Sequence, residues 1–287
     1  MSENTQVTSQ LAEKWQVWRA KAEAYYQRIL SLPNDSFEKT LAVAFWLCLA
    51  CAVVVSFAAV ALKPLQAANK AADMKRNILE VVGLYEPGMD IDTAFKRFEI
   101  KVVDLKTGEF ADDIDPKTYD MRKAARDSKL SEPVPKDRDI AQIKRKPKYA
   151  TIYLLKDEGG ETQALVLPVW GYGLWSTMYG FLALEPDCNT VIGINFYDQG
   201  ETPGLGGEVV NPNWRALWKG KKVYDENGQP VLRLVKGSVS PDQPGAEYRV
   251  DALAGATLTS NGVSNLIRFW LGEDGYKPFL DKFCGKL

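Results

Sequence analysis

The stretch that decides the architecture reads Leu41-Ala-Val-Ala-Phe-Trp-Leu-Cys-Leu-Ala-Cys-Ala-Val-Val-Val-Ser-Phe-Ala-Ala-Val-Ala-Leu62. These 22 consecutive residues carry no charge, and Ser56 holds their only hydroxyl group. A helix of this length, at about 1.5 Å rise per residue, matches the roughly 30 Å hydrocarbon core of a bilayer. A cleaved signal peptide would have a shorter apolar core, nearer to the N-terminus. We therefore predict one retained transmembrane helix over residues 37–62, in contact with membrane lipid.

Basic residues flank this span on both sides. The twenty residues before it hold Lys21, Arg28 and Lys39, and the twenty after it hold Lys63, Lys70, Lys75 and Arg76. Under the positive-inside rule this difference of one charge leans towards an outside N-terminus. The difference is too small to assign the orientation from charge alone.

Residues 1–36 precede the span as an N-terminal helical extension. Apolar side chains recur there at helical steps of three and four residues, at Leu11, Trp15, Trp18, Ala22, Tyr25, Tyr26, Ile29 and Leu30. Acidic and basic residues balance, which argues against a strongly cationic membrane-surface helix. Two interpretations remain open: docking on a partner subunit, and a solvated helix with an interfacial aromatic stripe.

Residues 63–90 are predicted as a helical connector, with a helix over 67–84 that ends at Glu86-Pro87-Gly88. Residues 91–287 then alternate strand and helix signals, which predicts an α+β domain. Strands are expected at 98–105, 150–155, 162–169, 191–197, 231–234 and 247–250. The basic run at 144–148 is interpreted as a solvated loop.

Composition excludes several function classes. The 287 residues include no histidine, which rules out Ser-His-Asp and Cys-His catalytic systems and His-ligated zinc or haem within this chain. The formal net charge of -1 gives no broad basic field, so nucleic-acid binding is not expected. We predict neither a catalytic side chain nor a metal site, and any chemistry must be carried by a group other than imidazole.

Glycines and aromatic residues are interleaved between Leu167 and Gly180. Glycines let the backbone approach a flat ligand closely, and four aromatic side chains could wall an apolar slot: Trp170, Tyr172, Trp175 and Tyr179. The alternative is a tightly turned aromatic segment of the core.

A glycine-rich loop, Glu201-Thr-Pro-Gly-Leu-Gly-Gly207, follows a predicted strand. It is not a GxGxxG fingerprint, because Val209 occupies the place of the third glycine, and no Gly-Lys-Ser/Thr follows as in a Walker A loop. The loop offers backbone N–H groups beside Glu201 and Thr202. The alternative is a plain turn.

The third unusual stretch is Asp251-Ala-Leu-Ala-Gly-Ala-Thr-Leu-Thr-Ser-Asn-Gly262. An amphipathic helix follows, with apolar residues at 263, 266, 267, 270 and 271 and Gly272 at its end. The hydroxyl cluster 257–261 therefore lies at a helix N-terminus, where unpaired N–H groups favour a phosphate. N-capping by Thr259 or Ser260 is the simpler interpretation, but it leaves Gly-Ala-Thr unexplained.

Residues 251–257 resemble the flavinylation motif Asp-x-x-(Ser/Thr)-Gly-Ala-(Thr/Ser) of the FMN-binding domain family. This chain departs from the motif at Ala254, where Ser or Thr is usual, and so loses one possible hydrogen bond to the phosphate. The 201–206 loop and the 174–180 segment resemble stretches that follow the same order in that family. With the single span, the resemblance runs from about residue 40 to the C-terminus. It points to the C-subunit family of Na+-translocating NADH:quinone oxidoreductases, ahead of the G-subunit family of Rnf electron-transport complexes, which is less similar over residues 65–150.

The resemblance implies that Thr257 carries FMN through a phosphoester and that a separate flavin transferase attaches it from FAD. It assigns these residues to the cofactor: Leu174, Trp175, Ser176, Thr177, Glu201, Thr202, Gly204, Leu205, Gly255, Ala256, Thr257, Leu258 and Thr259. The phosphate is expected over the helix N-terminus and the ring in the slot.

By the same resemblance, the chain is an electron carrier of a bacterial inner-membrane complex that oxidises NADH, reduces ubiquinone and exports Na+. Electrons would come from an intramembrane iron-sulfur centre and leave for another covalently bound FMN, both in neighbouring subunits. The globular domain is expected in the periplasm, and no NADH site is visible in this chain. The alternative from another class is a membrane-tethered module that binds flavin non-covalently.

The four cysteines form two groups. Cys48 and Cys51 lie on one face of the predicted span, as small packing residues or as iron-sulfur ligands shared with a neighbouring subunit. Cys188 and Cys284 could pair in an oxidising compartment, and their spacing alone does not decide the matter.

Overall fold

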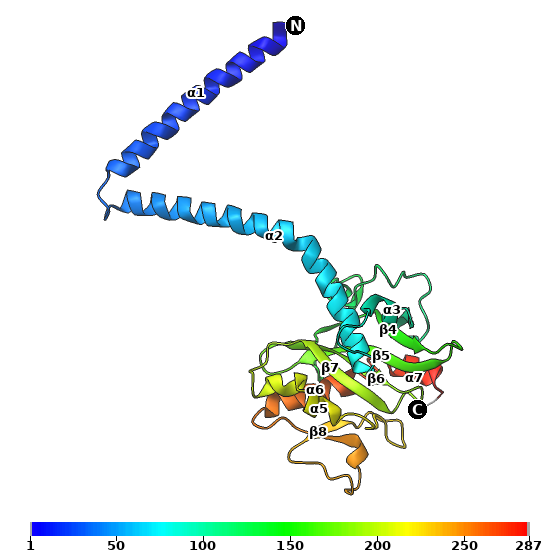
Figure 1. Ribbon diagram of the computed structural model, residues 1–287. Coiled ribbons are helices and arrows are strands. Elements are labelled where there is room, and N and C mark those ends of the chain that lie inside the picture. Colours follow the sequence, from blue (N-terminus) through cyan, green and yellow to red (C-terminus); the bar gives the residue numbers. More distant parts are fainter. Residues whose placement is uncertain (1, 286–287) are drawn as a thin grey trace. The chain divides into compact units, whose positions relative to one another are not determined.

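The computed structural model describes residues 2–285, with side chains from residue 14 onward, and divides into two compact units between Asn69 and Lys70. The first unit holds helix α1 (Ser2–Ser31) and most of helix α2 (Phe37–Val81) (Figure 1). Within the described residues, α2 is the one helix long and apolar enough to cross a membrane. Apart from Ala42, the side chains of residues 41–62 are exposed, as lipid contact requires; Phe57, for example, is 76% exposed.

Helix α2 does not end where the sequence suggested. A break was expected after residue 62, but the helix continues through Pro64 to Val81. Proline removes one intrahelical hydrogen bond, which a long helix tolerates at the cost of a local distortion. The last turns of α2 then become part of the second unit, where Ile78, Leu79 and Val81 are buried.

The short turn between α1 and α2 is held by charged side chains. Lys39 Nζ donates to the backbone oxygen of Leu32 and to Asn34 Oδ1, each at 2.9 Å. Arg28 pairs with Glu38 at 2.9 Å. The predicted helix in residues 1–36 is confirmed, and both interpretations of its aromatic stripe stay open because Trp15 and Trp18 are exposed.

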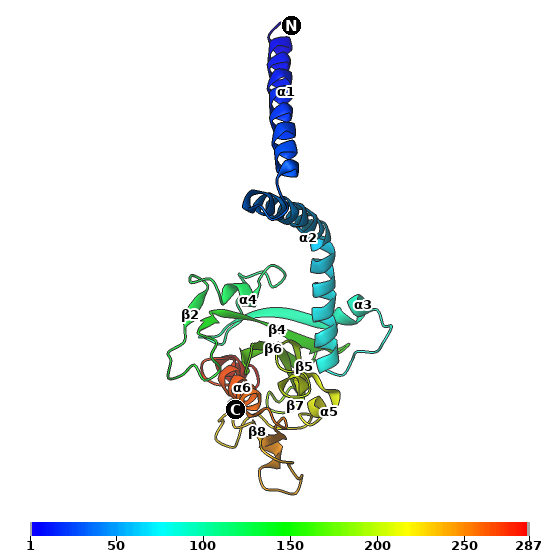
Figure 2. The same cartoon turned by 90° about the vertical axis from the view of Figure 1, so that its left-hand side faces the viewer.

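The second unit is built on an antiparallel five-stranded sheet, in the order β1-β4-β5-β6-β7. Its strands are β1 (Phe98–Asp104), β4 (Tyr149–Lys156), β5 (Thr162–Tyr172), β6 (Thr177–Leu184) and β7 (Val191–Asp198). Alternate side chains enter two cores: Leu165 and Leu167 face one, and Ala164 and Val166 face the other. Both faces of the sheet are therefore covered, one by α6 (Thr257–Trp270) and the other by the end of α2 (Figure 2).

The remaining elements are short. They are α3 (Ile91–Phe95), α4 (Met121–Ala124), α5 (Pro212–Ala216), α7 (Lys277–Phe283), the 3₁₀ helices η1 (Gly206–Val210) and η2 (Ala246–Tyr248), and the strand pairs β2 (Ser131–Pro133) with β3 (Arg145–Pro147) and β8 (Arg233–Val235) with β9 (Arg249–Asp251). The α+β prediction is confirmed, as are the strands at 98–105, 150–155, 162–169 and 191–197.

Three local predictions need correction. The basic run at 144–148 is not all loop, because β3 pairs there with β2. Strands β8 and β9 each begin two residues later than expected, and before β9 the residues Glu247 and Tyr248 belong to η2. Strand β6 was not predicted, because it starts inside the glycine- and aromatic-rich stretch that was interpreted as a slot.

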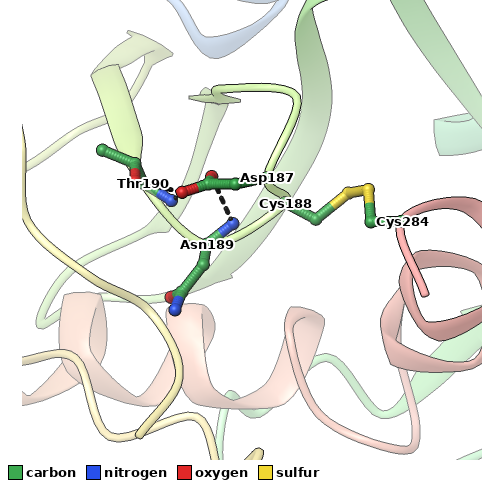
Figure 3. The surroundings of a disulfide bond; sticks show 5 residues. All are labelled: Asp187, Cys188, Asn189, Thr190 and Cys284. Carbon is green, nitrogen blue, oxygen red and sulfur yellow. Dashed lines mark hydrogen bonds between the residues drawn. A yellow bond between two sulfur atoms is a disulfide. The ribbon is translucent and has the colours of Figure 1, made fainter. Parts of the chain in front are cut away.

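A disulfide joins Cys188, in the turn between β6 and β7, to Cys284, just after α7 (Figure 3). The two Cα atoms lie 6.1 Å apart and 96 residues separate the cysteines in sequence. In the same turn, the Asp187 carboxylate accepts hydrogen bonds from the backbone N–H groups of Asn189 at 2.9 Å and Thr190 at 2.7 Å. The open question of the Cys188–Cys284 pair is thus answered, whereas Cys48 and Cys51 are free on α2.

Candidate functional site

Three segments that are far apart in sequence meet at the carboxylate of Glu201. Glu201 Oε1 accepts hydrogen bonds from the backbone N–H groups of Leu174 at 3.1 Å, Trp175 at 2.9 Å and Ser176 at 3.2 Å. Its Oε2 accepts a hydrogen bond from Thr259 Oγ1, in the first turn of α6, at 2.6 Å. The predicted gathering of the 174–180, 201–207 and 251–262 stretches is therefore present, with Glu201 as its centre.

Burial and hydrogen bonding act on Glu201 in opposite directions. Burial alone would raise the pKa of this carboxyl group, but the Thr259 hydroxyl and the three amide N–H groups stabilise the charged form. The hydrogen bonds outweigh burial, so the pKa of Glu201 is lowered and the side chain is an anion at neutral pH. Both carboxylate oxygens accept hydrogen bonds from protein groups, so Glu201 holds the segments of the site together and does not bind a ligand itself.

Two glycines let the segments approach Glu201 closely. A Cβ at Gly173 would lie 2.6 Å from Glu201 Oε1, and one at Gly206 would lie 2.5 Å from Thr259 Oγ1. Neither position has room for a side chain unless the carboxylate or the hydroxyl moves. The glycines near the slot therefore serve protein packing at these two positions.

Helix α6 begins at Thr257, and Ala256 is its N-cap residue without a side-chain cap. The capping interpretation of Thr259 and Ser260 is wrong. Thr259 donates to Glu201, and Ser260 Oγ accepts the Leu253 N–H at 3.0 Å. No side chain of the first turn therefore caps the backbone N–H groups at the positive end of the helix, so they can bind an anion.

The three hydroxyl groups in this turn differ sharply in exposure. Thr257 is exposed, whereas Thr259 is 1% exposed and Ser260 is 3% exposed. Only Thr257 therefore offers its hydroxyl group to a reagent in solution. The other two hold the turn in place.

Four exposed apolar side chains belong to the segments that meet at Glu201 and Thr259, and we call them the apolar rim: Leu174, Trp175, Leu205 and Leu258. Trp175 is 66% exposed and Leu258 is 59% exposed. Leu205 reaches the Gly255 position, where a Cβ would lie 3.0 Å from its Cδ2. Apolar side chains gathered at an exposed surface are typical of a site that a ligand or a partner covers.

Other predicted site residues have structural roles. The Ser176 hydroxyl oxygen accepts the Gly200 N–H at 2.7 Å, and Thr177 opens strand β6. In the glycine-rich loop, the Thr202 carbonyl accepts the N–H groups of Leu205 at 3.1 Å and Gly207 at 2.9 Å, so these amides are not free for a ligand. Gly204 and Gly255 both adopt positive φ angles, which favour glycine.

The predicted aromatic walls are partly wrong. Trp170 is buried and packs against Trp270, with ring centroids 4.3 Å apart. Tyr179 is covered by Arg122, whose guanidinium carbon lies 3.5 Å from the ring centroid. Trp170 therefore belongs to the core, and Tyr179 is partly buried against the same core. Tyr172 and Trp175 remain exposed at the site.

Two supporting contacts were not predicted from the sequence. Asp251, the first residue of the motif, accepts the Val239 N–H on Oδ1 at 2.8 Å, and its backbone oxygen accepts Trp214 Nε1–H at 2.9 Å. Both bonds fix the loop that leads into α6. Asp251 was recognised as part of a motif, but no local pattern indicates partners 12 and 37 residues away.

Comparison with known proteins gives consistent results. Residues 173–272 match the FMN-binding domain family. The chain is 54% identical over 251 residues to the C-subunit of the Na+-translocating NADH-quinone reductase from Pseudomonas aeruginosa, and the match covers 86% of this chain and 96% of that protein. It is 49% identical to the Yersinia pestis C-subunit, over 87% of this chain and 94% of the relative.

Two solved structures of C-subunits are similar to this chain as well. The crystal structure of Shewanella oneidensis NqrC superposes with a TM-score of 0.69 at 36% identity, covering 75% of this chain and 98% of that one. The C-subunit of the Na+-translocating NADH-quinone reductase from Parabacteroides distasonis gives a TM-score of 0.59 at 25% identity, over 76% of this chain and 96% of that one.

Proposed function

This chain belongs to the C-subunit family of the Na+-translocating NADH-quinone reductase, and from that premise we propose that it carries FMN as a phosphoester on Thr257. It is a subunit of a multi-subunit oxidoreductase, with an FMN-binding domain and one helix that can span a membrane. Identity over nearly the full length of the relatives favours this family over the G-subunit family of Rnf complexes.

One observation carries the choice of Thr257: among the hydroxyl groups in the first turn of α6, it alone is exposed. It lies at the uncapped N-terminus of a 14-residue helix, where backbone N–H groups favour a phosphate dianion. Thr259 is held by Glu201 and Ser260 by Leu253, so neither competes as acceptor.

The residues present fit the cofactor. The first-turn N–H groups of α6 would hold the phosphate, and the apolar rim would take the isoalloxazine ring. FMN, when bound, supplies both one- and two-electron redox chemistry. The protein's part is to bind, orient and shield: Glu201 fixes the 174–176 backbone to Thr259 in the first turn of α6, and so holds Leu174 and Trp175 at the same end of the helix as Thr257. Ala254 leaves one fewer hydroxyl group for the phosphate than the usual motif.

Attachment requires a second protein. A threonine hydroxyl group is a weak nucleophile without a nearby base, the chain has no histidine, and the Glu201 oxygens are already hydrogen-bonded. A flavin transferase would deprotonate Thr257 Oγ1, which attacks the FMN phosphorus of FAD. The new O–P bond forms as the pyrophosphate bond breaks and AMP leaves, so the reaction needs no oxidant or reductant.

As an electron carrier, the protein would receive electrons from an intramembrane iron-sulfur centre and pass them to another covalently bound FMN, both in neighbouring subunits. The whole complex would oxidise NADH, reduce ubiquinone and export Na+. A covalent tether suits this role, because the domain keeps its cofactor even where free flavin would be diluted away.

The disulfide supports a periplasmic position for the globular domain. Structural disulfides persist in oxidising compartments and are rare in the cytosol. The Cys188–Cys284 pair lies in the domain that follows the α2 span, so the domain would face the periplasm from the bacterial inner membrane. The basic residues lean by one charge towards the opposite orientation, a difference too small to outweigh the disulfide.

The test compares Thr257→Val with Thr257→Ser, both produced together with the transferase. After denaturing electrophoresis, the wild-type band should fluoresce under ultraviolet light, and the peptide that contains Thr257 should gain the mass of FMN less one water. Thr257→Val should lose both signals, whereas Thr257→Ser, which keeps a hydroxyl group, should retain the band at reduced intensity.

Fluorescence that survives Thr257→Val would show that the acceptor lies elsewhere. A dark wild-type band would instead favour the non-covalent binding module.

A further inference from the structure

A second site lies on the side of the domain formed by β8, β9 and the C-terminal half of α6. A hollow of about 510 Å³ opens there, and three arginines line it: Arg233, Arg249 and Arg268. We call it the arginine pocket. Arg268 lies eleven residues after Thr257, about 16 Å along the axis of α6, so the pocket is separate from the proposed flavin site.

Two of these arginines are direct neighbours across a sheet. Strands β8 and β9 run parallel, and Arg233 is in register with Arg249. Residues in register project from the same face of neighbouring strands, which lie about 4.8 Å apart. Like charges placed this way destabilise a sheet unless an anion lies between them. The pair thus places two like charges next to each other across the sheet.

The protein does not neutralise this charge itself. Within residues 14–285, none of the three guanidinium groups forms an ion pair. One carboxylate, Asp225, lines the pocket, and it accepts the N–H groups of Asn227 and Gln229, each at 2.9 Å. Arg268 also lies in the last turn of α6, where a cation is favoured by the helix dipole, but this explains only one of the three.

Space is kept open beside Arg249. Gly245 adopts φ +75°, and a Cβ there would lie 3.6 Å from Arg249 Nη2. Any side chain at this position would be strained and would project towards the guanidinium group. Tyr248 adds a polar tip to the wall. Planar guanidinium groups bind phosphate and carboxylate oxygens through paired hydrogen bonds, so the lining is suited to an oxyanion.

We propose that the arginine pocket binds a small oxyanion with at least two negative charges, of the pyrophosphate class. Three cations against one carboxylate leave an excess that a dianion or a larger polyanion neutralises. A volume of about 510 Å³ is in the range of small-molecule sites. The ligand joins β8, β9 and α6 and thereby stabilises the C-terminal half of the domain.

The test uses the full-length protein in a non-ionic detergent, with thermal unfolding followed by tryptophan fluorescence. Inorganic pyrophosphate is titrated at constant ionic strength, with sodium chloride as the reference. A ligand that binds the folded state raises Tm in a saturable way. Wild-type protein should show such a rise with pyrophosphate and none with chloride.

Arg233→Gln and Arg249→Gln should each weaken the apparent affinity about tenfold, as expected for the loss of one charge-assisted hydrogen bond. The matched control is Arg126→Gln, an exposed arginine outside the pocket, which should leave the affinity unchanged. Without ligand, Arg249→Gln should be at least as stable as wild type, because the repulsion from Arg233 is relieved. A merely structural role for Arg249 would instead lower its Tm.

Three outcomes would overturn the proposal. The first is the absence of a saturable rise in wild type, and the second is an equal rise in the Arg233→Gln/Arg249→Gln double variant. The third comes from a parallel titration with a hexaglutamate peptide. Stabilisation by the peptide but not by pyrophosphate would assign the pocket to an acidic segment of another protein.

Discussion

Two turns in this domain are each organised by one carboxylate, and they do so in contrasting ways. Asp187 accepts hydrogen bonds from residues two and three positions ahead of it and pairs with Lys222 at 3.2 Å. Glu201 accepts hydrogen bonds from residues 25 to 58 positions away and has no cationic partner among the described residues. The first arrangement completes a local turn, and the second joins separate parts of the chain.

The difference shows how each region is secured. The Asp187 turn is backed by a covalent link, since Cys188 is bonded to Cys284. The Glu201 junction depends on hydrogen bonds alone, and it borders an exposed surface that a cofactor is proposed to cover. We therefore expect a single substitution at the junction to disturb cofactor binding, and one at the disulfide-backed turn to lower stability.

The largest expected effect comes from breaking the covalent link. Cys188→Ser opens a loop closed over 96 residues and should lower the free energy of unfolding by about 3–4 kcal/mol. Denaturant titration of the purified full-length protein, followed by tryptophan fluorescence, measures it. Cys48→Ser, which changes a free cysteine, is the control and should leave stability unchanged. A loss below about 1 kcal/mol in Cys188→Ser would contradict this prediction.

Glu201→Ala is expected to have the second largest effect and to lower the free energy of unfolding by about 2–3 kcal/mol. The substitution leaves the buried Thr259 hydroxyl group and the backbone amides of 174–176 without their acceptor. Unlike the cysteine variant, it should also weaken the flavin fluorescence of the protein band. Glu201→Gln keeps an acceptor oxygen and should fall between Ala and wild type. Glu158→Ala, at an exposed site, is the matched control. Full fluorescence in Glu201→Ala would mean that the junction does not position the cofactor.

A pair of threonine variants should sharpen the contrast within α6. Thr259→Val removes a buried hydroxyl group and should cost about 1 kcal/mol of stability while keeping the flavin. Thr257→Val should lose the flavin, and its unfolding free energy without cofactor should change by less than about 0.5 kcal/mol because the side chain is exposed. If the two variants behaved alike, the division between support and attachment would be wrong.

The smallest effect concerns pH. Burial disfavours the Asp187 anion, but hydrogen bonds from Thr190 and Asn189 and the Lys222 ammonium group lower its pKa from 3.8 to about 2. Because the folded state binds fewer protons than the unfolded state, this contribution is complete above pH 4 and is lost as the pH falls towards 2. Asp187→Asn should therefore flatten the decline of stability between these pH values. An unchanged slope in acid titrations of the variant would exclude Asp187 as a contributor.

Local patterns in the sequence were sufficient for much of the fold. The uncharged run 41–62 predicts the span because its length matches a bilayer, and the helical periodicity after residue 262 places Thr257 at a helix start. Strand β6 was not predicted because most of its residues are buried on both faces of the sheet, so its sequence shows no alternation of polar and apolar residues. Pro64 suggested a helix boundary, but only the distortion of a continuous helix resulted.

Contacts between distant residues were beyond such patterns. Thr257 could be singled out by its motif, but nothing near Glu201 shows that its carboxylate reaches Thr259, 58 residues away. The same holds for the disulfide, which spacing left undecided, and for Trp170, which is buried against Trp270 of α6, 100 residues away. Motifs identify a site, and tertiary contacts decide which of its side chains face outward.

The Cys188–Cys284 link also imposes an order on biosynthesis. Polypeptides leave the ribosome N-terminus first, so the Glu201 loop and the Thr257 turn both exist before Cys284 has been translated. The large ring that encloses them stays open until α7 has been made and an oxidant reaches both thiols. A modifying enzyme would thus encounter the proposed acceptor, Thr257, in two topologies, in a chain with a free tail and in a closed ring, and the timing of oxidation selects between them.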